Sequence, residues 1–165
     1  MNSTSEIEYP YLPEGRRIKY VSQDNQFILM ARKFAQENSL DKTMPGSAII
    51  VKDGEVIGIG ANGSEYHKSN ECERVKLGCK SGTGYELCEG CHPKNHSEPS
   101  AIRDAISKGN DTKDADLYLW GHWWFCVDCW NTMIEARIKN VYLLEGSEKL
   151  FNKDNSENVI GRQFE

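Results

Sequence analysis

The stretch SAIIVKDGEVIGIGANG, residues 47 to 63, decides the fold of this chain. Two short runs rich in β-branched residues flank the pair Asp53-Gly54. A two-residue Asp-Gly step between such runs is the strongest short-range signal for a β-hairpin. We therefore predict two antiparallel strands here, joined by a tight turn.

The segments around this hairpin alternate between helix and strand patterns. Ahead of it, apolar residues at helical spacing predict a helix over residues 25–38. Behind it the patterns predict, in order, a helix (98–108), a strand (116–120), a helix (127–138) and a strand (140–145). This order predicts an α/β fold with a mixed sheet, in which the later strands are parallel and covered by helices.

The chain has 165 residues, the length of one domain, and we predict a single domain over residues 1–165. Residues 1–22 contain two prolines and no sustained apolar period, which predicts an irregular arm on the surface. Residues 64–95 hold four cysteines but few large aliphatic side chains, which predicts a loop-rich insertion that apolar burial alone cannot order. Residues 158–164 carry a weak signal for a short helix or strand.

Composition bears on partners and location. The net charge is -5 and the cations are scattered, so a polyanion such as DNA or tRNA is a poor fit as a partner. The N-terminus is polar and acidic, and no stretch approaches the ~18 apolar residues of a membrane span. We therefore predict a cytoplasmic protein that acts on a small molecule, without a nucleic-acid or membrane partner. In that reducing compartment, closely spaced cysteines are more often metal ligands than disulfides.

One histidine and two cysteines fall at the starts of two predicted helices. His96 lies at the start of one, and Cys126 and Cys129 lie within one turn at the start of the next. An imidazole and two thiolates leave the fourth position of tetrahedral zinc open, which is typical of catalytic sites. Zinc lowers the pKa of bound water toward ~7, and a carboxylate that is not a ligand, such as Glu98, can move its proton.

These residues also carry a family resemblance. His96-Ser97-Glu98, followed by FCVDC, resembles the HxE…PCxxC signature of the zinc-dependent nucleotide and base deaminases. HSEPSAI is similar to their HAExxAI, and GIGANG is similar to the GxGYNG hairpin of deoxycytidylate deaminases. MIEARIKNVYLLE is similar to the stretch that follows their CxxC, so the resemblance covers roughly residues 25 to 146. It implies a three-layer α/β/α cytidine-deaminase-like fold with a mixed five-stranded sheet.

The resemblance also implies roles for particular residues. Glu98 would be the catalytic proton carrier, and Asn62 would hydrogen-bond a sugar hydroxyl, although it would alternatively serve only the turn that follows. The cluster WGHWW, residues 120–124, would wall the pocket, with Trp123 or Trp124 stacking on the base; the alternative is that this cluster is plain core.

Two positions depart from the family pattern. Phe125 replaces the proline that precedes the first cysteine of CxxC, which removes a φ restraint that helps a helix to start. Ala61 replaces the tyrosine of GxGYNG, a segment linked in the family to regulation by nucleotides. The pattern therefore supports the chemistry of the family more strongly than its regulation.

The insertion contains a second set of potential metal ligands. Four thiolates close a tetrahedral shell, so their spacing predicts a structural zinc that orders the loop. His67 or His92 would alternatively replace one cysteine. The predicted ligands are Cys72, Cys79, Cys88 and Cys91.

The leading functional prediction is the hydrolytic deamination of a pyrimidine nucleotide, dCMP to dUMP, by an enzyme with one catalytic and one structural zinc. An alternative is a deaminase of another amino-base, such as cytosine, guanine or a related heterocycle. A third is a binding module that keeps the fold and the zinc but has lost turnover, for which Phe125 is the support. By resemblance we also predict a homo-oligomer, either a dimer or a hexamer.

Overall fold

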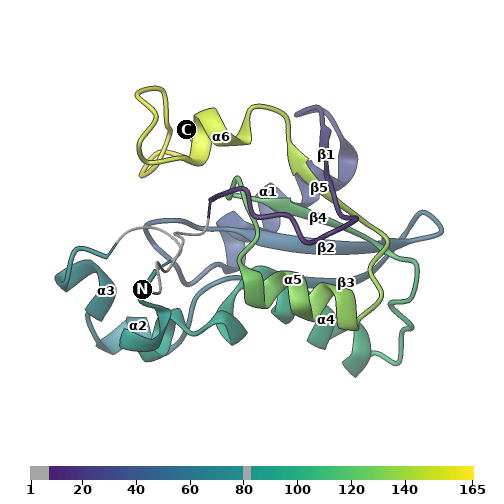
Figure 1. Cartoon of the computed structure of the whole chain (residues 1–165), viewed down its shortest axis with the longest axis horizontal. Helices are drawn as coiled ribbons and strands as arrows, with labels where there is room; N and C mark the ends of the chain where they lie inside the picture. The colour runs from purple at the N-terminus through teal and green to yellow at the C-terminus, as the bar shows by residue number, and fades with distance from the viewer. Residues whose placement is uncertain (1–7, 80–82) are drawn as a thin grey trace, which may run out of the picture.

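The computed structural model describes residues 8–79 and 83–165, and Figure 1 shows its central sheet with helices on both sides. The strands run in the order β1-β5-β4-β2-β3 and are β1 (Ile18–Val21), β2 (Ser47–Lys52), β3 (Glu55–Ala61), β4 (Asp116–Trp120) and β5 (Asn140–Leu144). The α-helices are α1 (Gln26–Asn38), α2 (Tyr66–Ser69), α3 (Glu73–Lys76), α4 (Ser97–Ser107), α5 (Val127–Glu135) and α6 (Ser147–Phe151). Three short 3-10 helices lie between α3 and α4: η1 (Tyr85–Leu87), η2 (Glu89–Cys91) and η3 (Pro93–Asn95). Within the described ranges, no helix has both the length and the apolar character that crossing a membrane requires.

The hairpin predicted from residues 47–63 is present as β2 and β3. The two strands are antiparallel, and Asp53 and Gly54 take φ angles of 52° and 80°. Positive φ at both central residues gives the two-residue turn whose twist suits a hairpin. On its other side β2 pairs antiparallel with β4, which runs parallel to β5. The prediction of a mixed sheet with parallel later strands is therefore confirmed.

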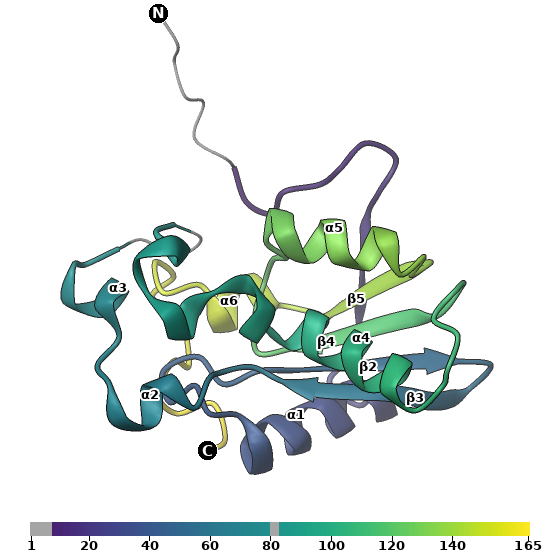
Figure 2. The same cartoon turned by 90° about the horizontal axis from the view of Figure 1, so that it is seen from below.

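Helices cover both faces of the sheet, so the architecture has three layers. Figure 2 shows α5 and α1 on opposite sides of the strands. α4 and α5 pack on the face that carries Leu117 and Leu119, and α1 packs on the face that carries Ile49 and Tyr118. Along each strand, alternate side chains thus enter one of two apolar clusters. The α/β/α prediction is confirmed.

The N-terminal segment contributes a strand that the sequence pattern does not indicate. Residues Ile18–Val21 form β1, an edge strand parallel to β5, with Ile18 opposite Val141 and Val21 opposite Leu144. The prediction of an irregular arm over residues 1–22 is therefore wrong for these four residues. Four residues are too few to display a period, and main-chain pairing with a distant strand holds them in place. Residues 1–7 of the arm lie outside the described part of the chain.

The C-terminal segment packs through single side chains. Phe151, at the end of α6, belongs to the apolar cluster under α1. Gln163 is buried and donates from Nε2 to the carbonyl of Thr43 at 3.0 Å. Residues 158–164 form a series of turns and contain neither the short helix nor the strand that their pattern weakly indicates.

Two glycines of β3 allow α4 to lie close to the sheet. A Cβ atom on Gly60 would stand 2.4 Å from the backbone nitrogen of Ala101, and one on Gly58 would stand 2.6 Å from the Ala101 carbonyl oxygen. Both neighbours are backbone atoms, so they can yield only if the helix itself moves. These glycines therefore set the distance between the sheet and the first turns of α4.

Replacing Gly60 with alanine is expected to destabilise the protein by about 1–3 kcal/mol, the usual cost of overpacking. The added methyl group would push α4 away from β3, and with it the residues at the start of the helix. Thermal or urea unfolding followed by circular dichroism measures the effect. An unchanged free energy of unfolding would contradict the close approach.

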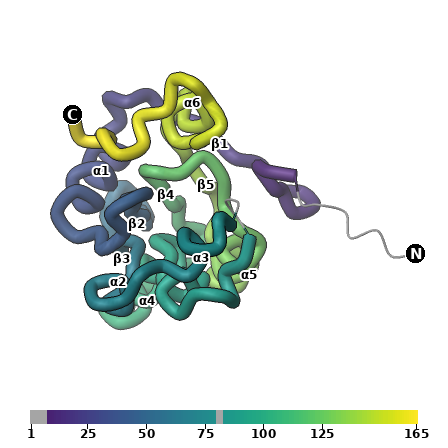
Figure 3. The backbone as a smooth tube through the Cα atoms, turned by 90° about the vertical axis from the view of Figure 1, so that its left-hand side faces the viewer, coloured from purple at the N-terminus to yellow at the C-terminus, as the bar shows by residue number. Residues whose placement is uncertain are grey.

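One end of the sheet gathers the segments that form the site. Ser47 pairs with both Ala61 and Trp120, so the start of β2 lies between the ends of β3 and β4. The insertion leaves and rejoins the domain here, because the Gly63 amide donates to the Asn95 carbonyl at 3.1 Å across its base. Figure 3 views the molecule from this end, with α3 in front of the sheet.

The insertion has little apolar burial of its own. Neither apolar cluster beside the sheet includes a residue from the described part of the insertion, 64–79 and 83–95. Val75 and Leu77 are 72% and 65% exposed. Other interactions must order this segment.

Candidate active site and second metal cluster

One imidazole and two thiols converge between the starts of α4 and α5. His96 precedes the first residue of α4, Cys126 precedes the first residue of α5, and Cys129 lies in the first turn of α5. The Nδ1 atom of His96 lies 3.3 Å from Cys129 Sγ and 3.5 Å from Cys126 Sγ. The two sulfur atoms are 3.0 Å apart. The structure thus brings together the three residues that the sequence predicts as catalytic zinc ligands.

These separations suit one tetrahedral ion. With Zn–S bonds of about 2.3 Å and Zn–N bonds of about 2.0–2.1 Å, donors on a zinc ion lie about 3.5–3.8 Å apart. The two nitrogen–sulfur separations of 3.3 and 3.5 Å are close to this range, and the sulfur–sulfur separation of 3.0 Å is shorter. A hydrogen bond from Cys129 lowers the pKa of the Cys126 thiol to about 5, so one sulfur is a thiolate at neutral pH. The donor set therefore fits zinc with three protein ligands and one further position.

Glu98 lies next to this trio and is not one of its donors. It stands in the first turn of α4, and its side chain is buried, with 4% of the residue exposed. Burial raises the pKa of its carboxyl above the ordinary value. A carboxyl group with a raised pKa holds a proton more readily than an exposed one does, and accepting and returning a proton is what general acid–base catalysis requires.

The hydroxyl group of Ser97 is buried without a partner. The residue is 1% exposed, and its Oγ has no hydrogen-bond partner among the described residues. Leaving a buried hydroxyl unpaired costs about 1–3 kcal/mol, so such a group requires an explanation. Ser97 lines the same cavity as Glu98.

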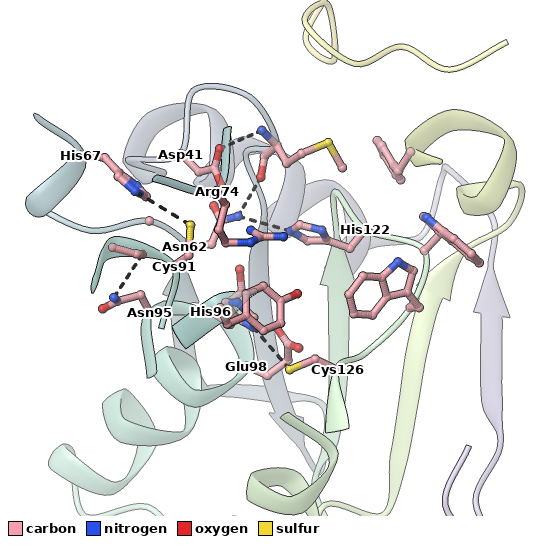
Figure 4. Close-up of a pocket in the computed structure, with 18 residues that line it drawn as sticks. Asp41, Asn62, His67, Arg74, Cys91, Asn95, His96, Glu98, His122 and Cys126 are labelled. Atoms are coloured by element: carbon pink, nitrogen blue, oxygen red, sulfur yellow. Dashed lines mark hydrogen bonds between the residues drawn. The ribbon is translucent and has the colours of Figure 1, made fainter. Parts of the chain in front are cut away.

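A cavity of about 140 Å³ opens onto these residues. In Figure 4, His96, Glu98 and Cys126 lie on one side of it, and Asn62 and His122 lie across from them. The remaining wall comes from the loop before β2, from the insertion and from the segment after β4. These parts contribute Asp41, Met44, Arg74, Tyr85, Asn95, Trp123 and Trp124, among others.

Contacts within the protein occupy the side chain of Asn62. Its Oδ1 accepts from the Gly46 amide at 2.9 Å and from the Ser39 hydroxyl at 2.5 Å. Its Nδ2 donates to the Met44 carbonyl at 2.7 Å and lies 3.3 Å from His122 Nε2. Asn62 therefore ties the loop before β2 to the end of β3. A sugar hydroxyl that binds Asn62 must replace one of these contacts, and the longest of them is the one to His122.

The residues of the cluster WGHWW lie partly in the cavity wall and partly in the core. Trp123 and Trp124 line the cavity, as the stacking prediction requires. Trp120 belongs to the apolar cluster under α1, and Trp123 also packs against that cluster. Burial lowers the pKa of His122 to about 4, so its ring is neutral at pH 7. The cavity wall on this side is therefore aromatic and uncharged.

Phe125 is a core residue. It is fully buried on the face covered by α4 and α5, and its ring centroid lies 5.3 Å from that of Trp130. The helix α5 still starts directly after Cys126, whose Sγ accepts the Cys129 amide hydrogen at 3.3 Å. Packing and this cap take the place of the φ restraint that a proline would impose.

A second cluster of donors lies in the insertion. The Nε2 atom of His67 is 3.2 Å from Cys88 Sγ and 3.9 Å from Cys91 Sγ. Cys72 Sγ is 3.4 Å from Cys91 Sγ, and all four donor atoms lie within 4.8 Å of one another. Burial opposes ionisation of Cys88, but hydrogen bonds led by that from His67 lower its pKa to about 6. Three sulfurs and one nitrogen at these distances fit a closed tetrahedral zinc shell.

This cluster differs from the predicted one at a single position. Cys79 is not part of it; its amide donates to the Arg74 carbonyl at 2.9 Å. Of the two histidines weighed as replacements, the structure brings in His67, while His92 Nδ1 caps the Lys94 amide at 3.0 Å. A Cβ atom on Gly90 would stand 2.5 Å from His67 Nε2, so the glycine leaves room for the imidazole.

Several residues that line the cavity were not predicted from the sequence. Ser97 had a visible signal, because it stands where HAExxAI has alanine. Arg74 and Tyr85 had none, because they come from the insertion, whose path depends on the second cluster. The guanidinium carbon of Arg74 lies 4.5 Å from the Tyr85 ring centroid, and that ring lies 5.0 Å from the ring of His96.

The chain is similar to several solved deaminase structures, and no curated protein matches it. A dCMP deaminase from the cyanophage S-TIM5, in complex with dCMP and dUMP, is 21% identical over 74% of this chain and 82% of that chain, with a TM-score of 0.51. A guanine deaminase from Bacillus subtilis is 24% identical over 82% of each chain, with a TM-score of 0.45. A diaminohydroxyphosphoribosylaminopyrimidine deaminase/5-amino-6-(5-phosphoribosylamino)uracil reductase from Thermotoga maritima is 24% identical, with a TM-score of 0.44; the match covers 71% of this chain and 28% of that one. At such identities the likeness shows the fold alone.

The family model described as the cytidine and deoxycytidylate deaminase zinc-binding region matches residues 21–145. That span includes the His96, Cys126 and Cys129 trio, Glu98 and the cluster in the insertion. It also covers β2 to β5 and the helices that present the trio. The chain therefore belongs to the cytidine and deoxycytidylate deaminase family.

Proposed function

We propose that this protein catalyses the zinc-dependent hydrolytic deamination of a pyrimidine nucleotide, dCMP to dUMP with release of ammonia. The observation that carries the proposal is the buried carboxyl of Glu98, placed in a cavity beside a three-donor zinc trio. Membership of the deaminase family supports the reaction class. The residues around the cavity support the choice of substrate.

The trio and Glu98 would divide the chemistry between them. When bound by His96, Cys126 and Cys129, zinc supplies a Lewis acid that activates water for attack on the amino-bearing carbon of the ring. Glu98 accepts a proton from that water and returns it to the ring nitrogen, and then carries a proton to the departing amino group. Water thus contributes its oxygen to the product, and the amino nitrogen leaves as ammonia. Because Glu98 is buried, bulk water does not compete for these protons.

The remaining cavity residues would hold the base. Trp123 or Trp124 would stack on a pyrimidine, worth about 1–3 kcal/mol per ring; the Tyr9 ring already lies against Trp124 at a centroid distance of 4.0 Å. The unpaired hydroxyl of Ser97 can donate to an acceptor on the ring, such as a carbonyl oxygen. Asn62 would contact the sugar at the expense of its bond to His122.

Replacing Ser97 with alanine is expected to raise KM for the substrate about 3- to 10-fold with little change in kcat, because one neutral hydrogen bond to the base is lost. The variant should be at least as stable as the wild type, because the unpaired buried hydroxyl is removed. Steady-state kinetics and thermal unfolding check both statements. A lower melting temperature with an unchanged KM would show that the hydroxyl serves the fold instead.

An ammonia-release panel tests the proposed function. Zinc-loaded wild type would be incubated with dCMP, deoxycytidine, cytosine, guanine and adenine, each at several concentrations. The proposal expects the highest kcat/KM for dCMP. Faster release from a free base would favour the alternative of an amino-base deaminase, and no release from any compound would favour the binding module. The core position of Phe125 removes the main support for that module.

The remaining predictions concern assembly, location and metal content. We propose one zinc in the trio and one in the cluster of the insertion, so zinc analysis should find two equivalents per chain. A homo-oligomer and a cytoplasmic location also stay predictions, and sedimentation of the purified protein tests the first of them.

A further inference from the structure

A second and larger cavity adjoins the one that holds Glu98. Its volume is about 590 Å³, and it lies between the insertion, the loop before β2 and the C-terminal segment. Six residues line both cavities: Asp41, Met44, His67, Arg74, Cys91 and Phe151. A ligand that extends beyond the base-sized inner cavity would therefore pass these residues and enter the outer one.

Arg74 is the cationic side chain at this boundary. Figure 4 shows it directed into the inner cavity from the insertion, toward Asn62 and His122. Its Nε donates to the Thr83 carbonyl at 2.8 Å, its guanidinium carbon lies 4.5 Å from the Tyr85 ring centroid, and it also hydrogen-bonds to Cys91. A guanidinium group has five N–H donors in a planar fork, which is suited to a phosphate. These contacts fix the fork at the point where the two cavities meet.

The outer cavity has a positive balance of charge. Lys42, Lys68, Lys153 and Arg74 line it, against Asp41 and Glu71. Asp41 Oδ1 accepts the amides of Thr43 and Met44, and two ion pairs involve residues of the lining: Glu71 with Lys76 at 3.3 Å and Lys68 with Glu65 at 2.8 Å. Outside these two pairs the charged side chains of the lining are Lys42, Lys153 and Arg74, against Asp41. This excess of cations contrasts with the chain as a whole, whose net charge is -5. An anion is therefore the ligand that this cavity would attract.

We propose that Arg74 binds the phosphate of the substrate, so that the insertion is a recognition element for phosphorylated ligands. This proposal rests on the proposed function for the orientation of the ligand: the base lies beside Glu98, and the phosphate lies beside the guanidinium group of Arg74, where the inner cavity meets the outer one. The cluster of His67, Cys72, Cys88 and Cys91 then has a second role, because it holds the segment that presents Arg74.

A purely structural role of Arg74 has to be separated from this one. Its contact with Cys91 would also balance the charge of the thiolates in the cluster. In that case its loss would release zinc from the insertion. If Arg74 serves recognition, its loss would leave both zinc ions in place and would weaken only the binding of phosphorylated ligands.

The test compares Arg74→Gln with Lys94→Gln, which removes one positive charge from the same insertion outside both cavities; its ion-pair partner Glu89 also lies outside them. Zinc per chain is measured first, and two equivalents are expected in both variants. The ratio of kcat/KM for dCMP to that for deoxycytidine is then expected to fall about 10- to 100-fold in Arg74→Gln and to be unchanged in Lys94→Gln. Arg74→Lys, which keeps the charge but not the planar fork, should recover part of the ratio.

A binding measurement separates this proposal from the proposed function. Calorimetry with 2-deoxyribose 5-phosphate, which has a phosphate but no base, requires no turnover. Wild type and Lys94→Gln are expected to bind it at least 10-fold more tightly than Arg74→Gln does. Equal binding by all three proteins would overturn the proposal, as would loss of zinc from Arg74→Gln. Absence of deamination by the wild type, with this difference in binding intact, would instead remove the proposed function alone.

Discussion

Replacing Glu98 with glutamine is expected to lower kcat by about 10²- to 10⁴-fold, the contribution of a well-placed general acid–base group. Glutamine keeps the shape of the side chain but can neither accept a proton from water nor return it to the base. Because Glu98 lies outside the zinc trio, the variant should keep two zinc equivalents and still bind the product dUMP. Steady-state ammonia release, zinc analysis and calorimetry with dUMP provide the three measurements.

The same variant should be at least as stable as the wild type. Burial raises the pKa of Glu98, so the folded protein disfavours the charged carboxylate relative to the unfolded chain. Above the unfolded-state pKa this costs stability, and a neutral amide removes the cost. A rise in melting temperature together with the loss of turnover would mark Glu98 as a functional residue and not a structural one. Loss of zinc in this variant would mean that the carboxylate is itself a ligand, which would contradict the assigned role.

Replacing Cys88 with serine is expected to reduce the zinc content from two equivalents to one and to unfold the insertion. Structural zinc sites supply apparent binding free energies of about 10–16 kcal/mol in small zinc-binding peptides. The insertion has little apolar burial with which to offset such a loss, since Val75 and Leu77 face solvent. The sheet and its two apolar clusters should survive, because no described part of the insertion belongs to them. Zinc analysis and limited proteolysis measure the two effects, and cleavage is expected within residues 64–95.

The matched control is Cys79→Ser, which changes a cysteine of the same insertion that lies outside the cluster. It should keep two zinc equivalents and resist proteolysis as well as the wild type does. His67→Ala, by contrast, should behave like Cys88→Ser. If Cys79→Ser released zinc while His67→Ala did not, the ligands would be the four cysteines first predicted from their spacing.

Strong local signals made much of the fold predictable. The Asp53-Gly54 step specifies its own turn, and the helix that begins at Ser97 shows its apolar face within a few residues. β1 has no such signal. Its four residues are held by pairing with β5, more than a hundred positions away in the chain, and local patterns carry no information about such a contact.

The residues of the site also include some that the sequence predicts and some that it does not. His96, Cys126 and Cys129 were predictable because two helix starts at one end of a sheet leave few places for their side chains. The ligands in the insertion were not, because the short helices and turns of this segment decide which donors meet, and spacing alone does not distinguish Cys79 from His67. Arg74 depends on that same path, so its position in the cavity could be found only from the structure.

The hydrogen bond between Gly63 and Asn95 has a consequence for how such proteins diversify. This hydrogen bond joins the two ends of the insertion one residue before His96. The segment between them therefore leaves the domain and returns to it at the same place. A segment of another length or composition between Gly63 and Asn95 would leave α4 in the same position relative to the sheet. Under the proposed function, exchange of this one segment can change the preferred substrate while Glu98 and the three zinc donors keep their positions.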